Sequence, residues 1–371
     1  MVETCIGNLM LVADAQCVIP TKDLQADIPF FTKILNMRMD TIYPADDPRV
    51  AVFSGHGISI CIDKDAQVGP AQINLLAEDI KQIANGETEL KAPNGTQFKF
   101  IEKNPPLVFP ETQHQFVVRR LVDQAPWIIG RAGMHYRDLI PSRLGGSIIA
   151  SHIRIPDGGP VPDTVHYHTV GFQLIFCYKG WVDLVYEDQG EPFRLFAGNC
   201  VIQPPEIRHK VLYASDNIEV IEIGVPAEHV TTIDHTMELP TKEFKPEREF
   251  SGQKFVHNKA DEATWSDFRI PGFTCRDTTI ATNTKNVAGV QVVKPTGQDI
   301  KSTKHNCDIL FNFVMEGKMT LHAKDQPPHK LTPGDAFVIP PGLSSKYSEV
   351  SADLELLEVS LPGKFDTYYD T

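Results

Sequence analysis

Two histidines separated by one residue form the most chemically suggestive pattern in this sequence. His166 and His168 lie in the segment GGPVPDTVHYHTVGFQLIFCYKG, and Gln173 follows them. If the histidines lie on a strand, residues i and i+2 point to the same face, so the two imidazoles converge. Gln173 is an odd number of positions from His168 and shares their face only if the chain turns near Gly171, where glycine would permit the turn.

A third histidine, His209, follows later in the segment GNCVIQPPEIRHKVLY, directly after a rigid proline pair. Three neutral imidazoles with one oxygen donor suit a divalent first-row metal and leave coordination positions open for a substrate or dioxygen. We therefore predict a single site for one divalent first-row transition metal, with Fe(II) favoured over Mn, Ni or Zn. Its expected ligands are His166, His168, Gln173 and His209.

The elements that must position these residues read as short strands. Runs rich in Val, Ile, Phe and Tyr are separated by turn residues among the 28 Pro and 25 Gly, as in a sandwich or barrel. These runs also repeat. GNCVIQPPEIRH is similar to GDAFVIPPGLSS, and NIEVIEIGVPAEH is similar to DLELLEVSLPGKF, at a nearly constant sequence offset. The sequence thus predicts two homologous β units at 128–235 and 265–371, joined by a charged linker at 236–264.

At these residues the sequence resembles the cupin superfamily, whose second motif is G-x5-PxG-x2-H-x3-N. Gly198, Pro204 and His209 match this motif, with Glu206 where a glycine is usual and Tyr213 where an asparagine is usual. The resemblance implies a mainly β fold with two cupin barrels of the double-stranded β-helix (jelly-roll) type, a bicupin.

The first cupin motif, G-x5-HxH-x3,4-E-x6-G, is matched by His166, His168 and Gly180. Its leading glycine is displaced, because Gly159 lies one position early, and Gln173 replaces the usual glutamate. A neutral ligand in place of a carboxylate leaves more positive charge on the metal, so the site should favour anionic substrates or enolates.

The second unit has lost most of this pattern. Aligned on the repeat, its four ligand positions are Thr303, His305, Leu310 and Ser345. One histidine alone does not hold a metal tightly, and leucine cannot donate. We therefore expect a degenerate second barrel that serves as a structural or interface partner.

Three further residues are candidates for substrate binding: Arg154, Cys177 and Tyr213. Arg154 is suited to a carboxylate, although a solvent-facing arginine is an equal alternative. Strand alternation turns Cys177 inward as a small buried residue, and Tyr213 inward after His209. The opposite face of the same strand is apolar and should pack on the second barrel or on another subunit; it consists of Phe172, Leu174, Phe176 and Tyr178.

Residues 1–110 precede the barrels as a small α+β region. A strand, a helix at 24–35 capped by Asp23, and three more strands give a βαβββ order, and a second helix is expected at 73–86. This order resembles one module of the glyoxalase-like, or vicinal oxygen chelate, superfamily over residues 10–103. Because the metal ligands of that family have no clear counterparts here, we expect packing or assembly rather than a second catalytic centre.

The composition limits the partners. The 371 residues with 42% hydrophobic content can bury more than one core. A net charge of −13 disfavours nucleic acid and anionic membrane surfaces. Seven scattered cysteines without a CxxC pair, and a start without a basic leader, favour a reduced, cytoplasmic protein. The expected partner is a small anionic molecule, and the assembly is compatible with a homodimer.

Three functions fit these observations. The first is a metal-dependent dioxygenase for a small phenolic, diketone or carboxylate substrate, since the pattern resembles gentisate-type and quercetin-type two-barrel enzymes. The second is an isomerase, decarboxylase or hydrolase that uses the metal as a Lewis acid. The third is a non-catalytic bicupin that binds a small molecule. The sequence has no nucleotide-binding glycine loop and no GxSxG nucleophile elbow, which leaves the metal as the centre of any chemistry.

Overall fold

The computed structural model describes residues 12–34, 36–55, 57–67, 72–82, 88–91, 97–123, 126–297 and 300–369. Strands dominate these residues, so the prediction of a mainly β protein is confirmed. The chain divides into two compact units. The N-terminal unit comprises Met1–Val108 with Val230–Asp234, and the larger unit comprises Phe109–His229 with His235–Thr371.

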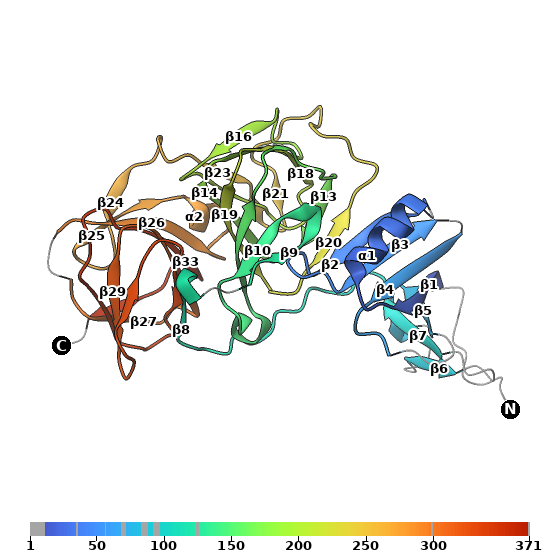
Figure 1. The fold of residues 1–371 in the computed structure, drawn as a ribbon, viewed down its shortest axis with the longest axis horizontal. Helices are drawn as coiled ribbons and strands as arrows, with labels where there is room; N and C mark the ends of the chain where they lie inside the picture. Colours follow the sequence, from blue (N-terminus) through green and yellow to red (C-terminus); the bar gives the residue numbers. More distant parts are fainter. Residues whose placement is uncertain are drawn as a thin grey trace. The chain divides into compact units, whose positions relative to one another are not determined.

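The N-terminal unit begins with the expected βαβββ order (Figure 1). Its elements are β1 (Val12–Pro20), α1 (Leu24–Pro29) continued by a π-helical turn (Phe30–Ile34), β2 (Arg38–Tyr43), β3 (Val50–Gly55) and β4 (Ile58–Asp63). Asp23 caps α1 as predicted, because its carboxylate accepts from the N–H groups of Gln25 and Ala26. The sheet runs β2-β3-β4-β1, with β1 parallel to β4.

The helix expected at 73–86 is wrong over its first part. Gln72–Ala77 is strand β5, which pairs antiparallel with β1 and parallel with β7 (Gln97–Glu102), and β6 (Glu89–Lys91) pairs with β7. Only a short 3-10 turn follows, at Ile80–Gln82, and 83–86 lie outside the described residues. Pairing on both sides of β5 outweighs local helix propensity. This unit also takes up β20 (Val230–Ile233), which pairs with β2 and comes from the end of the range expected for the first barrel.

The first barrel is formed by two sheets. One sheet contains β13 (His166–Thr169), β18 (His209–Ala214), β15 (Trp181–Tyr186) and β16 (Phe193–Phe196), with the short β12 (Gly159–Pro160) beside β18. The other contains β9 (Ile128–Ile129), β10 (His135–Asp138), β11 (Ile149–Ile155), β19 (Ile218–Val225), β14 (Phe172–Lys179) and β17 (Cys200–Ile202). Apolar side chains from both sheets, including Cys177, Leu184 and Val201, fill the space between them.

The second barrel repeats this plan. Its first sheet contains β24 (Trp265–Asp267), β25 (Phe273–Asp277), β26 (Gly289–Pro295), β33 (Glu355–Leu361), β28 (Ile309–Glu316) and β31 (Ala336–Val338). Its second contains β30 (His329–Leu331), β29 (Met319–Ala323), β32 (Ser345–Ser348), β27 (Thr303–His305) and β34 (Thr367–Tyr369), and the short helix α2 (Ile280–Asn283) precedes β26. His166 lies opposite His209 in the first barrel, and Thr303 lies opposite Ser345 in the second. The predicted residue correspondence between the repeats therefore holds at the level of strand register.

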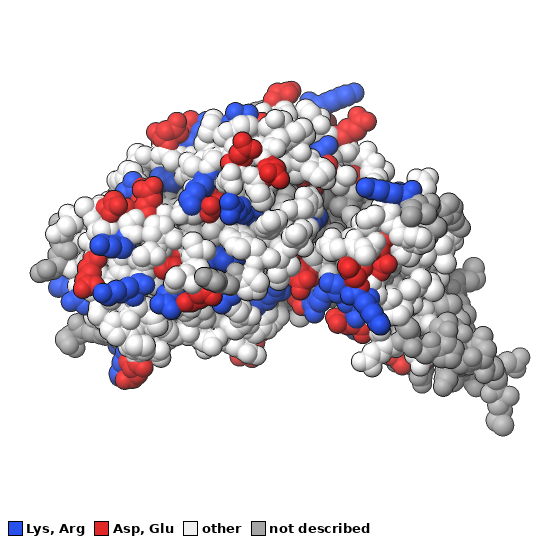
Figure 2. All heavy atoms as spheres, in the orientation of Figure 1, with Lys and Arg blue, Asp and Glu red and all other residues white. Residues whose placement is uncertain are grey.

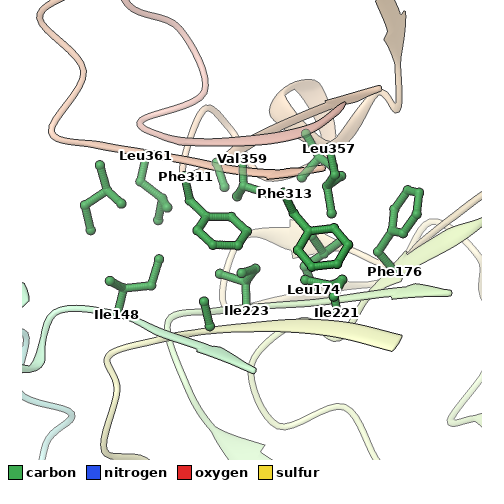
Figure 3. Packing of buried hydrophobic residues seen from close by; sticks show 14 of the residues in the cluster. Ile148, Leu174, Phe176, Ile221, Ile223, Phe311, Phe313, Leu357, Val359 and Leu361 are labelled. Carbon is green, nitrogen blue, oxygen red and sulfur yellow. The ribbon is translucent and has the colours of Figure 1, made fainter. Parts of the chain in front are cut away.

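One sheet of each barrel packs against the other in a continuous apolar layer (Figure 3). Leu174 and Phe176 on β14 meet Phe311 and Phe313 on β28, and Tyr178 packs at the margin of the layer. The apolar face of 172–178 therefore covers the second barrel, which was one of the two expected alternatives. Because this layer fixes one face of β14, it turns the other face, with Gln173, toward the barrel interior.

The segments that lead into each barrel are exchanged. Strand β8 (Val117–Arg119) precedes the first barrel but pairs with β31 of the second. Strand β23 (Val256–Asn258), in the predicted linker, pairs with β17 of the first barrel. Arg137 donates to the carbonyl of Gly334, and Arg276 donates to that of Gly198, across the same interface. The two barrels are thus joined by reciprocal strand pairing and hydrogen bonds as well as by apolar packing.

The surface carries charges of both signs. Figure 2 shows Lys and Arg side chains interspersed with Asp and Glu over the visible face. Among the described residues, no helix has the length and apolar character that a membrane crossing requires.

Candidate metal centre

Three buried histidines converge inside the first barrel. His166 and His168 project from β13, and His209 begins the neighbouring strand β18, directly across from His166. Their side chains are almost fully buried, at 1%, 5% and 2% exposure. One ring nitrogen from each lies within 4.8 Å of the others. The i, i+2 geometry predicted from the sequence is therefore present, and it joins His209 as expected.

The backbone fixes the tautomer of two of these rings. His166 Nδ1 lies 2.8 Å from the carbonyl oxygen of Thr164, and His209 Nδ1 lies 2.9 Å from that of Ile207. A carbonyl only accepts, so each Nδ1 carries the proton and donates it. The Nε2 lone pair of each ring then faces away from the backbone. That of His209 is available as a metal donor, whereas that of His166 accepts a 3.0 Å hydrogen bond from Nη2 of Arg131, which a metal would displace.

Electrostatics keep these rings neutral. Burial lowers the pKa of His166 and His168 well below the usual range, and the neighbouring Arg131 and His209 lower both further. Burial also lowers the pKa of His209 to about 4. At neutral pH all three imidazoles are therefore in the neutral form, which is the form that binds a metal.

Gln173 lies on the inner face of β14 and is fully buried. The chain passes from β13 in one sheet to β14 in the other through Gly171, where a Cβ atom would meet the ring of Phe109 at 2.5 Å. This is the turn that the sequence required. The Gln173 Nε2 donates to Glu222 Oε1 at 2.5 Å, while its Oε1 is buried without a hydrogen-bond partner among the described residues.

An arginine that the sequence reasoning missed lies beside the histidines. Arg131 Nη1 forms a 2.5 Å ion pair with Asp163, and its Nη2 lies 3.0 Å from His166 Nε2. Asp163 is itself held by the N–H of Val211 at 2.9 Å. Burial lowers the pKa of Arg131, but Asp163, with further contributions from Tyr136 and Glu222, outweighs burial, so the pKa is raised. A permanent cation thus lies at the site.

Other groups around the histidines were also not foreseen. The ring of His229, which had been given no role, lies 5.5 Å from that of His168. Tyr186 stacks on His209 at 5.5 Å and accepts a hydrogen bond from Gln203. His229 is distant from His168 in the sequence and has no ligand spacing, so only the fold brings the two rings together. Arg131 had one signal in the sequence, since Arg269 precedes the second barrel in a similar position.

The three predicted substrate residues lie in different places. Cys177 is buried in the barrel interior, as expected, and burial raises the pKa of its thiol to about 12, so it is not a thiolate. Arg154 shares a face of β11 with His152, which contacts Phe313 of the second barrel, and Arg154 donates to Asn217 at 2.8 Å. Arg154 therefore lies on the outer face of the barrel, away from the histidines.

Tyr213 does not face inward as predicted. Its side chain is 43% exposed and stacks on Trp181. Between Val211 and Tyr213, strand β18 has a bulge, since these two residues pair with the adjacent residues Leu184 and Asp183. An extra residue in one strand shifts the inward and outward alternation, so the pattern counted from His209 fails beyond Val211.

Comparison with known proteins defines the class of fold. The family model described as a cupin domain matches residues 289–360, which lie in the second barrel. No curated protein matches the sequence. The chain therefore carries a cupin domain, and its larger unit has the two-barrel fold described above.

Solved structures resemble the chain over most of its length. A variant of salicylate 1,2-dioxygenase from Pseudoaminobacter salicylatoxidans, in complex with gentisate, has a TM-score of 0.51 and 16% identity, covering 71% of this chain and 88% of that chain. Oxalate decarboxylase from Lactobacillus farciminis, in a formate complex, has a TM-score of 0.51 and 14% identity, covering 71% and 91%. Protein Ylba from E. coli has a TM-score of 0.50 and 12% identity, covering 70% and 95%. At these identities the likeness establishes the cupin fold alone.

Proposed function

We propose that the first barrel binds one divalent metal and that the protein is a metal-dependent oxidoreductase of the dioxygenase type. The observation that carries this proposal is the convergence of three buried, neutral imidazoles. Two of them have their Nε2 lone pairs left free of the backbone. A metal would bind through these lone pairs, and at His166 it would replace the Arg131 guanidinium, which lies 3.0 Å from Nε2.

The donor set fits a first-row metal. His166, His168 and His209 would hold it through ring nitrogens, and the orphaned Oε1 of Gln173 is suited to a fourth position. These ligands are all neutral and leave coordination positions open. Fe(II) bound there would supply redox chemistry with dioxygen, and we favour it over Mn, Ni or Zn.

Arg131 supports a small anionic substrate. Its guanidinium is held by Asp163 on one side, and its Nε is buried without a hydrogen-bond partner among the described residues. A metal dication beside this cation is unfavourable unless an anion lies between them. A substrate carboxylate or phenolate would occupy that position and accept from the guanidinium. Gentisate, present in one of the similar structures, is a small aromatic carboxylate of the same kind.

The decisive experiment measures metal content and oxygen uptake together. Wild-type protein, reconstituted with Fe(II) under nitrogen, should hold one equivalent of iron, and His209→Ala should hold almost none. His305→Ala is the matched control and should keep the wild-type content. Oxygen consumption that depends on gentisate or a related phenolic acid would support the dioxygenase. If wild type and His209→Ala carry equally little metal, the proposal is wrong.

A second candidate reaction keeps the same site but uses no oxygen. The similarity to oxalate decarboxylase favours a metal-dependent decarboxylase, isomerase or hydrolase of a small acid. Turnover under nitrogen with Mn or Zn would select this alternative. A full-occupancy small molecule with neither metal nor turnover would instead indicate a non-catalytic binding protein.

We also propose a role in packing or assembly for the N-terminal unit. Its βαβββ order, with β1 parallel to β4, supports a glyoxalase-like module without catalytic function. A homodimer remains compatible with this role. The described cysteines Cys17, Cys61, Cys177, Cys200, Cys275 and Cys307 are free thiols, which supports the proposed cytoplasmic location.

A further inference from the structure

We infer that Glu222 is a positioning residue of the metal site. It orients Gln173, and from β19 it supplies a negative charge that the motif of this chain lost when Gln173 replaced the usual glutamate. The inference rests on the proposed metal site and adds a residue that lies outside both motifs. It concerns a carboxylate in the barrel interior that the sequence pattern alone does not connect with the histidines.

Glu222 determines how the Gln173 amide is oriented. The two side chains are joined by a 2.5 Å hydrogen bond between Gln173 Nε2 and Glu222 Oε1. An ionised carboxylate only accepts, so the NH2 group of the amide must face it. The amide oxygen must then point the other way, and it is the atom that lacks a partner among the described residues. The carboxylate thereby presents the oxygen of Gln173, rather than its nitrogen, as a donor.

The strand places Glu222 inside the barrel. Ile221 and Ile223 belong to the apolar layer between the barrels, whereas Val220 packs against the interior of the first barrel. Because strand residues alternate, Glu222 shares the inner face with Val220. In the ladder it lies opposite Ile175, two residues after Gln173 on β14. It thus projects into the same interior as the ligand position that it contacts.

The charge of Glu222 reaches the centre of the site. Burial raises the pKa of Tyr186, which stacks on His209, and the charge of Glu222 adds to that rise. Glu222 also contributes, after Asp163, to the raised pKa of Arg131. Three imidazoles and an amide bring no charge to a dication, and Asp163 is matched by Arg131. The Glu222 carboxylate, which bonds Gln173, therefore adds negative charge beside the proposed metal position.

The test uses Co(II) titration of the metal-free full-length protein, followed by visible absorption and calorimetry. Glu222→Gln keeps the size and a hydrogen bond but removes the charge, and Glu222→Ala removes both. Each should weaken Co(II) binding by about 10-fold to 100-fold, the range found for residues that orient metal ligands, with the larger loss in Glu222→Ala. Glu219→Gln is the matched control, because Glu219 lies on the same strand but bonds His152 on the outer face. It should bind Co(II) as wild type does.

A double-mutant cycle tests whether Glu222 acts through Gln173. If it does, Glu222→Ala should cost much less in a Gln173→Leu background, and the two Co(II) spectra should be alike. Full additivity would overturn the orienting role. Wild-type affinity and spectrum in Glu222→Gln would overturn the inference while leaving the metal site intact. Failure of the wild type to bind Co(II) is a separate result, which would refute the proposed metal function itself. If Glu222→Ala does not fold, Glu222→Gln decides alone.

Discussion

The backbone holds the inward-facing histidines of the two barrels in opposite ways. In the first barrel, Nδ1 of His166 and of His209 donates to a backbone carbonyl, which leaves Nε2 as a donor for a metal. In the second, His305 Nδ1 accepts from the N–H of Cys307, so its Nε2 carries the proton and donates to the carbonyl of Ile339. Both nitrogens of His305 are therefore occupied by the backbone. A retained histidine is not a retained ligand, because the backbone sets its tautomer.

The interior carboxylates of the two barrels, Glu222 and Glu358, also differ in the partners that they bind. Glu358 on β33 corresponds to Glu222 on β19, and it lies opposite Asn312 just as Glu222 lies opposite Ile175. Arg269 holds both oxygens of Glu358, at 3.1 Å and 2.5 Å. In the first barrel, Arg131 turns instead to Asp163 and His166, and Glu222 bonds Gln173. The second barrel uses its carboxylate in a closed structural ion pair, whereas the first leaves its arginine and carboxylate beside the histidines.

The largest effect on stability should follow from breaking the ion pair of the second barrel. Glu358→Ala leaves the buried guanidinium of Arg269 without its partner, which should destabilise the protein by about 3 to 5 kcal/mol. Urea unfolding of the metal-free protein measures this loss. Glu222→Ala is the comparison, and should cost less because Arg131 keeps Asp163. Metal binding by Glu358→Ala should match wild type. A loss of stability below about 1 kcal/mol would contradict a structural role for this pair.

Acid should affect the two barrels alike, although only one is expected to bind a metal. Burial lowers the pKa of both His209 and His305 to about 4. An unfolded histidine has a pKa near 6.5, so acid protonates the unfolded chain before the folded one. The stability that each buried neutral ring contributes above pH 6.5 is therefore lost as the pH falls toward 4. Between pH 7 and pH 5 each should account for about 2 kcal/mol of lost stability.

Urea unfolding of metal-free His209→Gln and His305→Gln at pH 7 and pH 5 tests this expectation. Each variant should show a smaller loss on acidification than wild type. If His305→Gln retains the full wild-type loss, the wild-type His305 ring is not held in the neutral buried form, and the expected equal acid sensitivity of the two barrels is wrong.

Much of the site was predictable because its signals are local. The HxH spacing and the Gly198–His209 motif place His166, His168 and His209 correctly, since alternation on a strand and a rigid turn leave few other arrangements. The repeat also predicted which positions of the second barrel correspond, and the register of Thr303 with Ser345 agrees. The turn at Gly171 was deduced from the odd step to Gln173.

What failed or was missed depends on contacts distant in sequence. Tyr213 was misplaced by one bulge, which no composition signal marks. The helix expected at 73–86 begins instead as β5, because β1 and β7 pair on both of its sides. Arg131, Glu222 and His229 reach the site from separate parts of the chain, and only the closed barrel brings them together.

The smallest effects should come from Arg154 and Tyr213, the two predicted substrate residues that the fold turns outward. Arg154 makes one exposed hydrogen bond to Asn217, and Tyr213 stacks on Trp181 at the surface. Arg154→Ala and Tyr213→Ala should each change stability by about 1 kcal/mol or less and leave the metal content unchanged.

The roles of Arg131 and Arg154 in substrate binding can be distinguished by the affinity for a carboxylate probe such as gentisate, measured by calorimetry on the metal-loaded protein. It should fall strongly in Arg131→Met and stay unchanged in Arg154→Ala. The reverse result would mean that the substrate is recognised at the outer face of the barrel, and that the buried arginine serves only to hold Asp163.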